Sequence, residues 1–278
     1  MHGNKKLFKI NLNNMKRILI LVALLCTFSV SAQKKKKQIN GLDSIQKLDE
    51  VILSTSTIFG NKYVAKNRTG SAYYVSPKEL AKFNSSDINR VLRAVPGVSI
   101  YEEDGFGLRP NISLRGTSPE RSSKITIMED GVLIAPAPYS ASSAYYFPTI
   151  ARMEALEVLK GSSQVQYGPF TSGGAINMVS AQIPETFGGT ARASYGSFNS
   201  RQIHTKIGGE TKNFGYMIQY LNYGSDGFKN LPSGKNTGFN KNDIVAKLYA
   251  NLFPKATVKQ SIEFKFQYAD EVGNETYL

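Results

Sequence analysis

The last third of the chain alternates apolar and polar residues in five successive segments. In the third of them, Phe214, Tyr216, Ile218 and Tyr220 occupy every second position. Because side chains of a β-strand point alternately to opposite faces, each segment is predicted to be a strand with one apolar and one polar face. Segments of about ten residues with this pattern are typical of transmembrane β-barrels, although a soluble β-sandwich gives the same alternation. The other four segments span 190–195, 203–207, 244–252 and 262–268.

The N-terminus has the parts of a secretory signal peptide. Five basic residues precede an apolar run from Ile18 to Cys26, and the small residues Ser31-Ala32 follow. The run is shorter than the roughly 20 apolar residues of a transmembrane helix, so we expect export and cleavage before Gln33. Met15 is an alternative start. Export and the aromatic-rich apolar faces together favour the membrane interpretation of the five segments.

Charge and cysteine content follow from this segment. The only cysteine, Cys26, lies in the predicted signal peptide, so the mature chain has no thiol chemistry. Five of the 34 basic residues also lie there, which leaves 29 − 21 = +8 for the mature chain, and Lys34–Lys37 supply four of these charges. The high net charge is therefore poor evidence for a nucleic-acid partner, and no nucleic-acid-binding motif is recognised.

Local patterns in the middle of the chain predict a small α+β domain. Ser85 or Ser86 is expected to cap a helix over 87–94, and Asp130-Gly131 is a strong hairpin signal. A helical turn is predicted over 78–83 and another after Gly161. The expected strands span 72–75, 98–101, 124–129, 132–134, 156–160 and 175–179. On spacing alone, this is any glycine-punctuated α+β domain.

Several short motifs make the prediction more specific, because they occur in one order. They are Val95-Pro-Gly-Val98, Leu114-Arg-Gly116, Glu129-Asp-Gly-Val132, Lys160-Gly161, Tyr167-Gly-Pro169 and Gly173-Gly-Ala-Ile-Asn-Met-Val179. Together they resemble the plug domain of TonB-dependent outer-membrane receptors, from about Leu48 to Ser180. The segments 105–116 and 135–139 look most like the ferric citrate receptor branch.

The resemblance implies an α+β plug domain followed by the first antiparallel strands of a transmembrane β-barrel. The expected parts are a signal peptide (1–32), a disordered tail with a TonB-box-like segment (33–54), the plug domain (55–183) and five barrel strands (184–278). Plugged barrels have about 22 strands, and an open edge in lipid leaves backbone groups unpaired. We therefore expect the chain to be a fragment of a longer protein.

A segment just before the plug resembles the TonB box. This box adds as a strand to TonB, the periplasmic energy-coupling protein. Alternatively, the segment is simply the first strand of the plug. Its residues are Leu48, Asp49, Glu50, Val51 and Ile52.

Two loops, Glu102–Arg109 and Ala135–Phe147, are expected by resemblance to rise towards the outside and meet the ligand. A guanidinium binds carboxylates with two hydrogen bonds, which suits an anionic iron chelate. Arg109 is therefore the first candidate and Arg121 the second. The second loop contributes Tyr139, Tyr145 and Tyr146. A simpler interpretation is that both are surface loops whose aromatic residues pack on neighbours.

Two other basic residues, Arg115 and Lys160, are expected to be structural. In the family the basic residues of these two motifs pair with barrel glutamates near the lower half of the plug, so the resemblance implies such pairs here.

An enzyme is disfavoured by the sequence. Of the two histidines, His2 lies in the predicted signal peptide and His204 is alone on a predicted strand, so we expect neither a metal cluster nor a histidine-based triad. The segment 105–107 lacks the third glycine of a dinucleotide loop, and 161–168 lacks the lysine of a P-loop. We expect no catalytic residue, no metal site and no cofactor.

The predicted function is energised uptake of an iron chelate, ferric citrate or a similar siderophore, through the outer membrane of a Gram-negative bacterium. The expected partners are TonB, the ferric chelate and outer-membrane lipid. Another cargo, such as cobalamin or a glycan, is the main alternative, and an exported soluble β-rich binding protein is a weaker one.

Overall fold

The computed structural model describes residues 56–68, 70–83, 87–134, 143, 146–168, 171–229, 231, 236–253 and 260–274. The predicted signal peptide, the tail and the TonB-box-like segment lie outside the described residues. Residues from Glu50 onward form one compact unit. Among the described residues, no helix has both the length and the apolar character that crossing a membrane requires.

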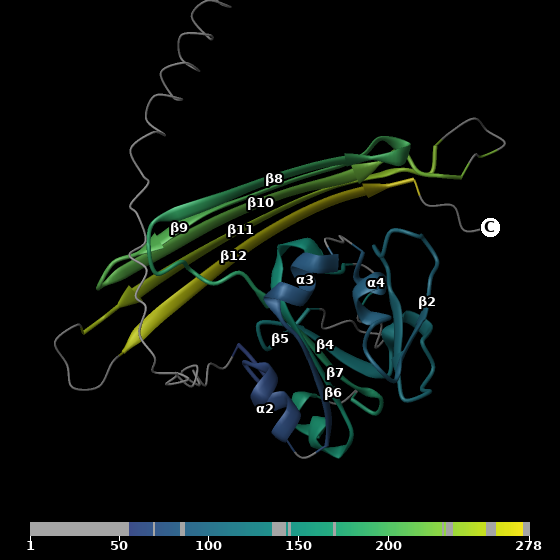
Figure 1. Cartoon of the computed structure of the whole chain (residues 1–278), viewed down its shortest axis with the longest axis horizontal. Coiled ribbons are helices and arrows are strands. Elements are labelled where there is room, and N and C mark those ends of the chain that lie inside the picture. The colour runs from purple at the N-terminus through teal and green to yellow at the C-terminus, as the bar shows by residue number, and fades with distance from the viewer. Residues whose placement is uncertain are drawn as a thin grey trace, which may run out of the picture. The chain divides into compact units, whose positions relative to one another are not determined.

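The first part of the described chain is built on a mixed five-stranded sheet with the order β1-β6-β7-β4-β5 (Figure 1). β4 and β7 pair in parallel, and the other neighbours are antiparallel. β6 and β7 are buried along almost their whole length, which agrees with their apolar residues on both faces. The strands are β1 (Ser71–Val75), β4 (Ile125–Glu129), β5 (Val132–Leu133), β6 (Met153–Lys160) and β7 (Gly174–Ser180).

A separate two-stranded sheet joins β2 (Val98–Tyr101) to β3 (Asn111–Leu114). β2 was expected, but β3 was not predicted, because its alternation of polar and apolar residues extends over only four positions, Asn111 to Leu114, beside a glycine-rich loop. Ile112 and Leu114 of β3 are fully buried, so the strand is held by the core.

Short helices cover this part of the chain. They are α2 (Lys62–Asn67), α3 (Pro77–Phe83), α4 (Ile88–Leu92), η1 (Glu120–Ser122), η2 (Ile150–Arg152) and η3 (Ser162–Tyr167). α2 was not predicted. α3 begins with a capping box, in which the Glu79 carboxylate accepts the N–H of Ser76 at 2.8 Å.

The prediction for α4 was wrong in its cap and its length. The side chain of Asp87, which was expected inside the helix, caps it by accepting the N–H of Asn89 at 2.8 Å. The helix ends at Leu92, where tighter i→i+3 bonds lead into Pro96. Its apolar residues Ile88 and Val91 join the core as the periodicity predicts.

The predicted hairpin between β4 and β5 is confirmed. Asp130 and Gly131 have φ angles of 52° and 79°. Two successive left-handed residues make a type I′ turn, which matches the twist of the flanking strands.

The second part of the described chain is a single antiparallel sheet of long strands in the order β12-β11-β10-β9-β8 (Figure 1). All five predicted strands are present and longer than expected. A short turn, η4 (Ser197–Asn199), joins the first two. The strands are β8 (Gly188–Gly196), β9 (Ser200–Glu210), β10 (Phe214–Ser225), β11 (Phe239–Asn251) and β12 (Ser261–Gly273).

The two faces of this second sheet are reversed relative to a soluble protein. Ile218 and Phe264 are 51% and 59% exposed, whereas Gln219 and Lys247 are each 2% exposed. Polar and charged side chains on the buried face contact the first part of the chain, as the ion pairs below show. An exposed apolar face opposite a polar one is the pattern of membrane-spanning strands, and it favours this interpretation over the soluble β-sandwich.

Candidate functional site

The arginine of η2 connects the two parts of the chain. Arg152 is buried, and its Nη1 and Nη2 atoms each donate to the Glu129 carboxylate at 2.7 Å. Its Nε atom donates to Oδ2 of Asp243, on β11, at 2.6 Å. One planar guanidinium therefore binds a carboxylate from each part, and its fork geometry suits this arrangement.

Two lysines of the second sheet extend this set of ion pairs. Lys265 on β12 binds Glu129 and also Asp130, the latter at 2.6 Å. Lys247 on β11 lies 3.8 Å from Asp130. We refer to Glu129, Asp130, Arg152, Asp243, Lys247 and Lys265 as the interface charge cluster. Its three carboxylates and three cations balance in formal charge.

The cluster keeps its two plug carboxylates, Glu129 and Asp130, ionised. Burial raises the pKa of Glu129, but the hydrogen bonds and charges of Arg152 and Lys265 more than offset it, so the net pKa lies below the ordinary value. Burial likewise raises the pKa of Asp130, and Lys247 and Lys265 lower it further than burial raises it. Both groups are therefore charged at neutral pH.

A second charged group lies where the 102–109 loop meets the second sheet. Nη1 of Arg109 lies 2.6 Å from Glu271 of β12, and Nζ of Lys241 lies 3.0 Å from the same carboxylate. The loop itself is held by Asp104, whose carboxylate accepts the backbone N–H of Arg109 at 2.8 Å. In this group, called the upper charge group below, two cations share one carboxylate.

Aromatic residues pack beside the upper charge group. The ring of Phe106, from the 102–109 loop, lies 4.7 Å from that of Phe239 and 5.6 Å from that of Phe228. Phe228 belongs to the connection between β10 and β11, so this loop and that connection are in direct contact. A small cavity of about 50 Å³ remains between them.

The structure describes two of the other predicted ligand residues, Arg121 and Tyr146. Arg121 is exposed, with its backbone N–H bound to Asn111 at 2.8 Å. Tyr146 lies at the interface charge cluster, where its hydroxyl accepts from Arg152 at 3.1 Å and from Gln267. Tyr139 and Tyr145 lie outside the described residues. Of the described candidates, Arg109 is a member of the upper charge group, and the ring of Tyr146 lies 5.4 Å from Nζ of Lys241 in that group.

The two basic residues expected to be structural lie close together. Lys160 donates to the Pro96 carbonyl at 2.5 Å, and burial together with the nearby charge of Arg115 lowers its pKa. Within the described part of the chain, neither residue pairs with a carboxylate. Their pairing with barrel glutamates stays a prediction.

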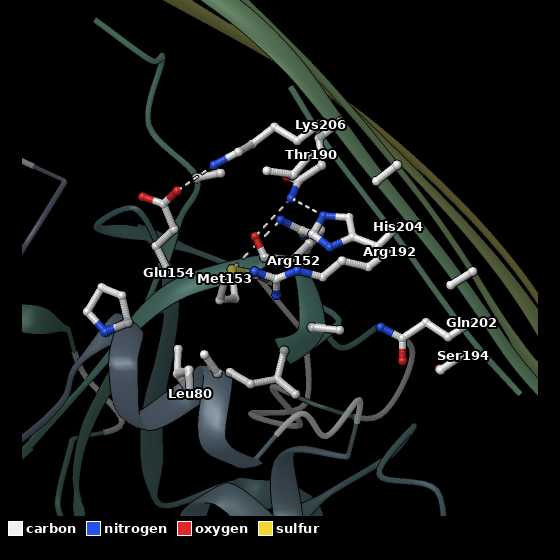
Figure 2. A pocket seen from close by; sticks show the side chains of 18 residues that line it. Leu80, Arg152, Met153, Glu154, Thr190, Arg192, Ser194, Gln202, His204 and Lys206 are labelled. Carbon is white, nitrogen blue, oxygen red and sulfur yellow. Dashed lines mark hydrogen bonds and ion pairs between the residues drawn. The ribbon is translucent and has the colours of Figure 1, made fainter. Parts of the chain in front are cut away.

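A cavity of about 780 Å³ lies between α3, η2, the start of β6 and the strands β8–β10 (Figure 2). Lys206 of β9 crosses it to bind Glu154 of β6 at 2.8 Å. Gln219 contacts His204 at 2.7 Å and donates to the Arg152 carbonyl at 3.2 Å. The polar lining can hold water or a small polar solute. No group of His, Cys, Asp and Glu side chains in the described ranges could hold a metal ion.

Comparisons with known proteins agree with this geometry. The model of the TonB-dependent receptor plug domain matches residues 64–175. The vitamin B12 transporter BtuB of Photobacterium profundum is 27% identical over 187 residues, which cover 66% of this chain and 30% of that protein.

Solved structures share the fold. The unliganded ferric citrate transporter FecA has a TM-score of 0.64 at 23% identity, over 77% of this chain and 33% of that one. The ferric yersiniabactin uptake receptor FyuA of Yersinia pestis has a TM-score of 0.54 at 24% identity, over 67% and 29%. The chain thus spans about a third of the length of these relatives.

The plug motifs and the reversed second sheet therefore have one explanation, and the resemblance drawn from the motifs is confirmed. Residues 64–175 match the plug domain of TonB-dependent receptors, and the fold of the chain, including β8–β12, matches that of the first third of the transporter FecA.

Proposed function

We propose that this chain is part of a TonB-dependent transporter that imports an anionic iron chelate, such as ferric citrate, through the outer membrane. The observation that carries the proposal is the upper charge group, in which Arg109 and Lys241 share the carboxylate of Glu271. The similarity to the fold of a ferric citrate transporter supports it.

The chemistry of this group favours an anionic cargo. With two cations and one carboxylate, the group carries one positive charge in excess. A carboxylate of the chelate can replace Glu271 as the partner of Arg109, while Lys241 retains Glu271. The exchange keeps each charge paired, and charge-assisted hydrogen bonds of this kind are stronger than neutral ones.

The remaining predicted residues have separate places in the proposal. Arg121 is exposed and free to approach a ligand from the plug surface. Tyr139 and Tyr145 are proposed to complete the contact from the second loop. Tyr146 is instead assigned to plug–barrel contact, because Arg152 and Gln267 both bind its hydroxyl.

The proposed energy source is TonB, bound by the segment from Leu48 to Ile52. Its position shortly before the first described residue of the plug, Ser56, supports this assignment. An extended segment with free backbone groups can add to a sheet edge of the partner.

A second cargo follows from the curated relative, which is a vitamin B12 transporter. Cobalamin is far larger and has no cluster of carboxylates. It would therefore gain little from the excess positive charge beside Arg109.

Calorimetry of the complete receptor, purified in detergent, measures its affinity for ferric citrate and for cobalamin and so distinguishes the two cargoes. Arg109→Ala should weaken ferric citrate binding by about 1.5–3 kcal/mol, the usual contribution of a hydrogen bond to a charged group. Arg93→Ala is the matched control, because Arg93 is an exposed plug arginine paired only with Glu102 in the described structure. Unchanged affinity in Arg109→Ala would remove Arg109 from the site. Binding of cobalamin without binding of ferric citrate would reject the cargo.

A further inference from the structure

A buried glutamate of the plug sheet holds the start of the described chain. The carboxylate of Glu157, on β6, accepts the backbone N–H groups of Ile58, Phe59 and Gly60 at 2.6, 2.8 and 2.9 Å. Glu157 has no exposed surface. Because Glu157 is buried, water cannot replace these three donors, and the hydrogen bonds therefore hold residues 58–60 against β6.

The residue opposite Glu157 on β7 makes the same segment part of a larger network. The Nδ2 atom of Asn177 donates to Glu157 at 2.8 Å and to the carbonyl of Ser56 at 2.9 Å. Its Oδ1 atom accepts the backbone N–H of Gly131 at 2.9 Å. Asn177 is fully buried, so one planar amide joins the N-terminal segment to the β4–β5 turn.

That turn is one of the parts of the plug that bind the second sheet. Asp130, the neighbour of Gly131, binds Lys265 of β12 at 2.6 Å and lies 3.8 Å from Lys247 of β11. Continuous hydrogen bonds and ion pairs therefore run from Ser56 and Ile58 through Glu157 and Asn177 to the interface charge cluster.

We propose that Glu157 and Asn177 couple the N-terminal segment of the plug to its contact with barrel strands β11 and β12. When residues 56–60 are withdrawn, the Glu157 carboxylate loses three donors and the Asn177 amide loses the Ser56 carbonyl. Both side chains are buried and must reorient to recover partners. Because the Asn177 amide is planar and rigid, its reorientation also removes the acceptor of Gly131 and loosens the turn that holds Lys265.

This coupling deepens the proposed function, since a partner that pulls on residues 48–54 would pull next on Ser56. The coupling itself is a property of the receptor alone, so it can be tested without TonB. A separate binding measurement between TonB and a peptide of residues 45–56 tests the proposed partner. Failure of that peptide to bind would reject the partner and leave the result below unaffected.

Hydrogen–deuterium exchange of the membrane-assembled receptor, followed by mass spectrometry, reads both ends of the network. Glu157→Gln should raise exchange in the peptide covering 56–62 at least tenfold, and in the peptide covering 129–134 at least threefold. Glu154→Gln is the matched control, because it changes the same residue type on the same strand. Glu154 binds Lys206 and has no contact with Asn177 in the described structure. The control should leave both peptides unchanged.

The reverse experiment decides between coupling and a merely local anchor, because coupling between two sites is reciprocal. Lys265→Met, which removes the contacts of Lys265 to Glu129 and Asp130, should raise exchange over 56–62 at least threefold. Lys206→Met breaks another plug–barrel ion pair and should not. Lys265 is partly exposed, so this variant keeps the test available if Glu157→Gln does not assemble. An effect of Lys265→Met on 56–62 no larger than that of Lys206→Met would overturn the proposal.

Discussion

The Nε atom of Arg152 lies 2.6 Å from Oδ2 of Asp243, although the two residues are 91 positions apart. Neither side chain has exposed surface. One belongs to the plug and the other to β11, so the pair joins the two parts of the chain. At this point of the interface, a buried charge of the plug is thus paired with a buried charge of β11 and has no contact with solvent.

The first prediction concerns removal of this arginine. Arg152→Met leaves the carboxylates of Glu129 and Asp243 buried without their main partner. Loss of one member of a buried ion pair costs about 3–5 kcal/mol. Denaturant unfolding of the receptor in detergent should show a loss of that size, with Arg93→Met, an exposed arginine, within about 0.5 kcal/mol of the parent. A loss below about 1 kcal/mol would mean that the pair contributes little to plug–barrel contact.

The second prediction concerns acid. The folded-state pKa values of Glu129 and Asp130 lie below their ordinary values of 4.5 and 3.8. Their ionised forms therefore stabilise the folded state at and above these ordinary values, and that contribution is lost as the pH falls through the lower folded-state values. Thermal unfolding should separate wild type from Glu129→Gln at neutral pH, and the difference should shrink below about pH 4. A difference independent of pH would contradict the ion-pair interpretation.

The third prediction concerns the cap of α4 and has the opposite sign. Burial raises the pKa of Asp87 to about 6, from an ordinary value of 3.8. The protonated form is therefore favoured in the folded state, and stability falls as the pH rises through about 6. Asp87→Asn keeps the oxygen that accepts the Asn89 N–H and removes the charge. It should stabilise the plug by about 1–3 kcal/mol at pH 8 and have little effect near pH 4. Thermal unfolding at the two pH values checks this, and destabilisation at pH 8 would contradict it.

Much of the fold could be predicted because its strands show their environment locally. The alternation of Phe214 to Tyr220 survives as the exposed face of β10, and Asp130-Gly131 forms the hairpin that its φ requirements favour. β3 and α2 could not be predicted in this way. β3 depends on pairing with β2, and the Asn61 cap of α2 was not recognised before a short polar helix.

The candidate site was less accessible from the sequence. Arg109 could be singled out as a loop arginine, but its partner Glu271 lies 162 positions away and is supplied by the last described strand. The roles of Arg152, Glu157 and Asn177 depend on register between strands, which no local pattern specifies. The sequence does carry one signal for the interface charge cluster. Asp243 and Lys247 lie on the same, buried face of β11, and charged residues inside a membrane-spanning segment usually pair with other charges.

A fourth prediction concerns processing of the N-terminus. Residues 1–32 are expected to be removed on export, so the mature chain should begin at Gln33. Mass spectrometry of the receptor purified from outer membranes tests this directly. A diacylated Cys26 at the mature N-terminus would show that the chain is a lipoprotein instead.

The central claim is energised import, and uptake of radiolabelled ferric citrate by intact cells tests it most directly. Val51→Pro removes a backbone donor from the TonB-box-like segment, and Gln38→Pro is the control in the polar tail. We predict that the parent and Gln38→Pro accumulate iron only in cells that have TonB. Val51→Pro should still bind ferric citrate at the cell surface but accumulate none. Equal accumulation by all three proteins, with or without TonB, would contradict the account.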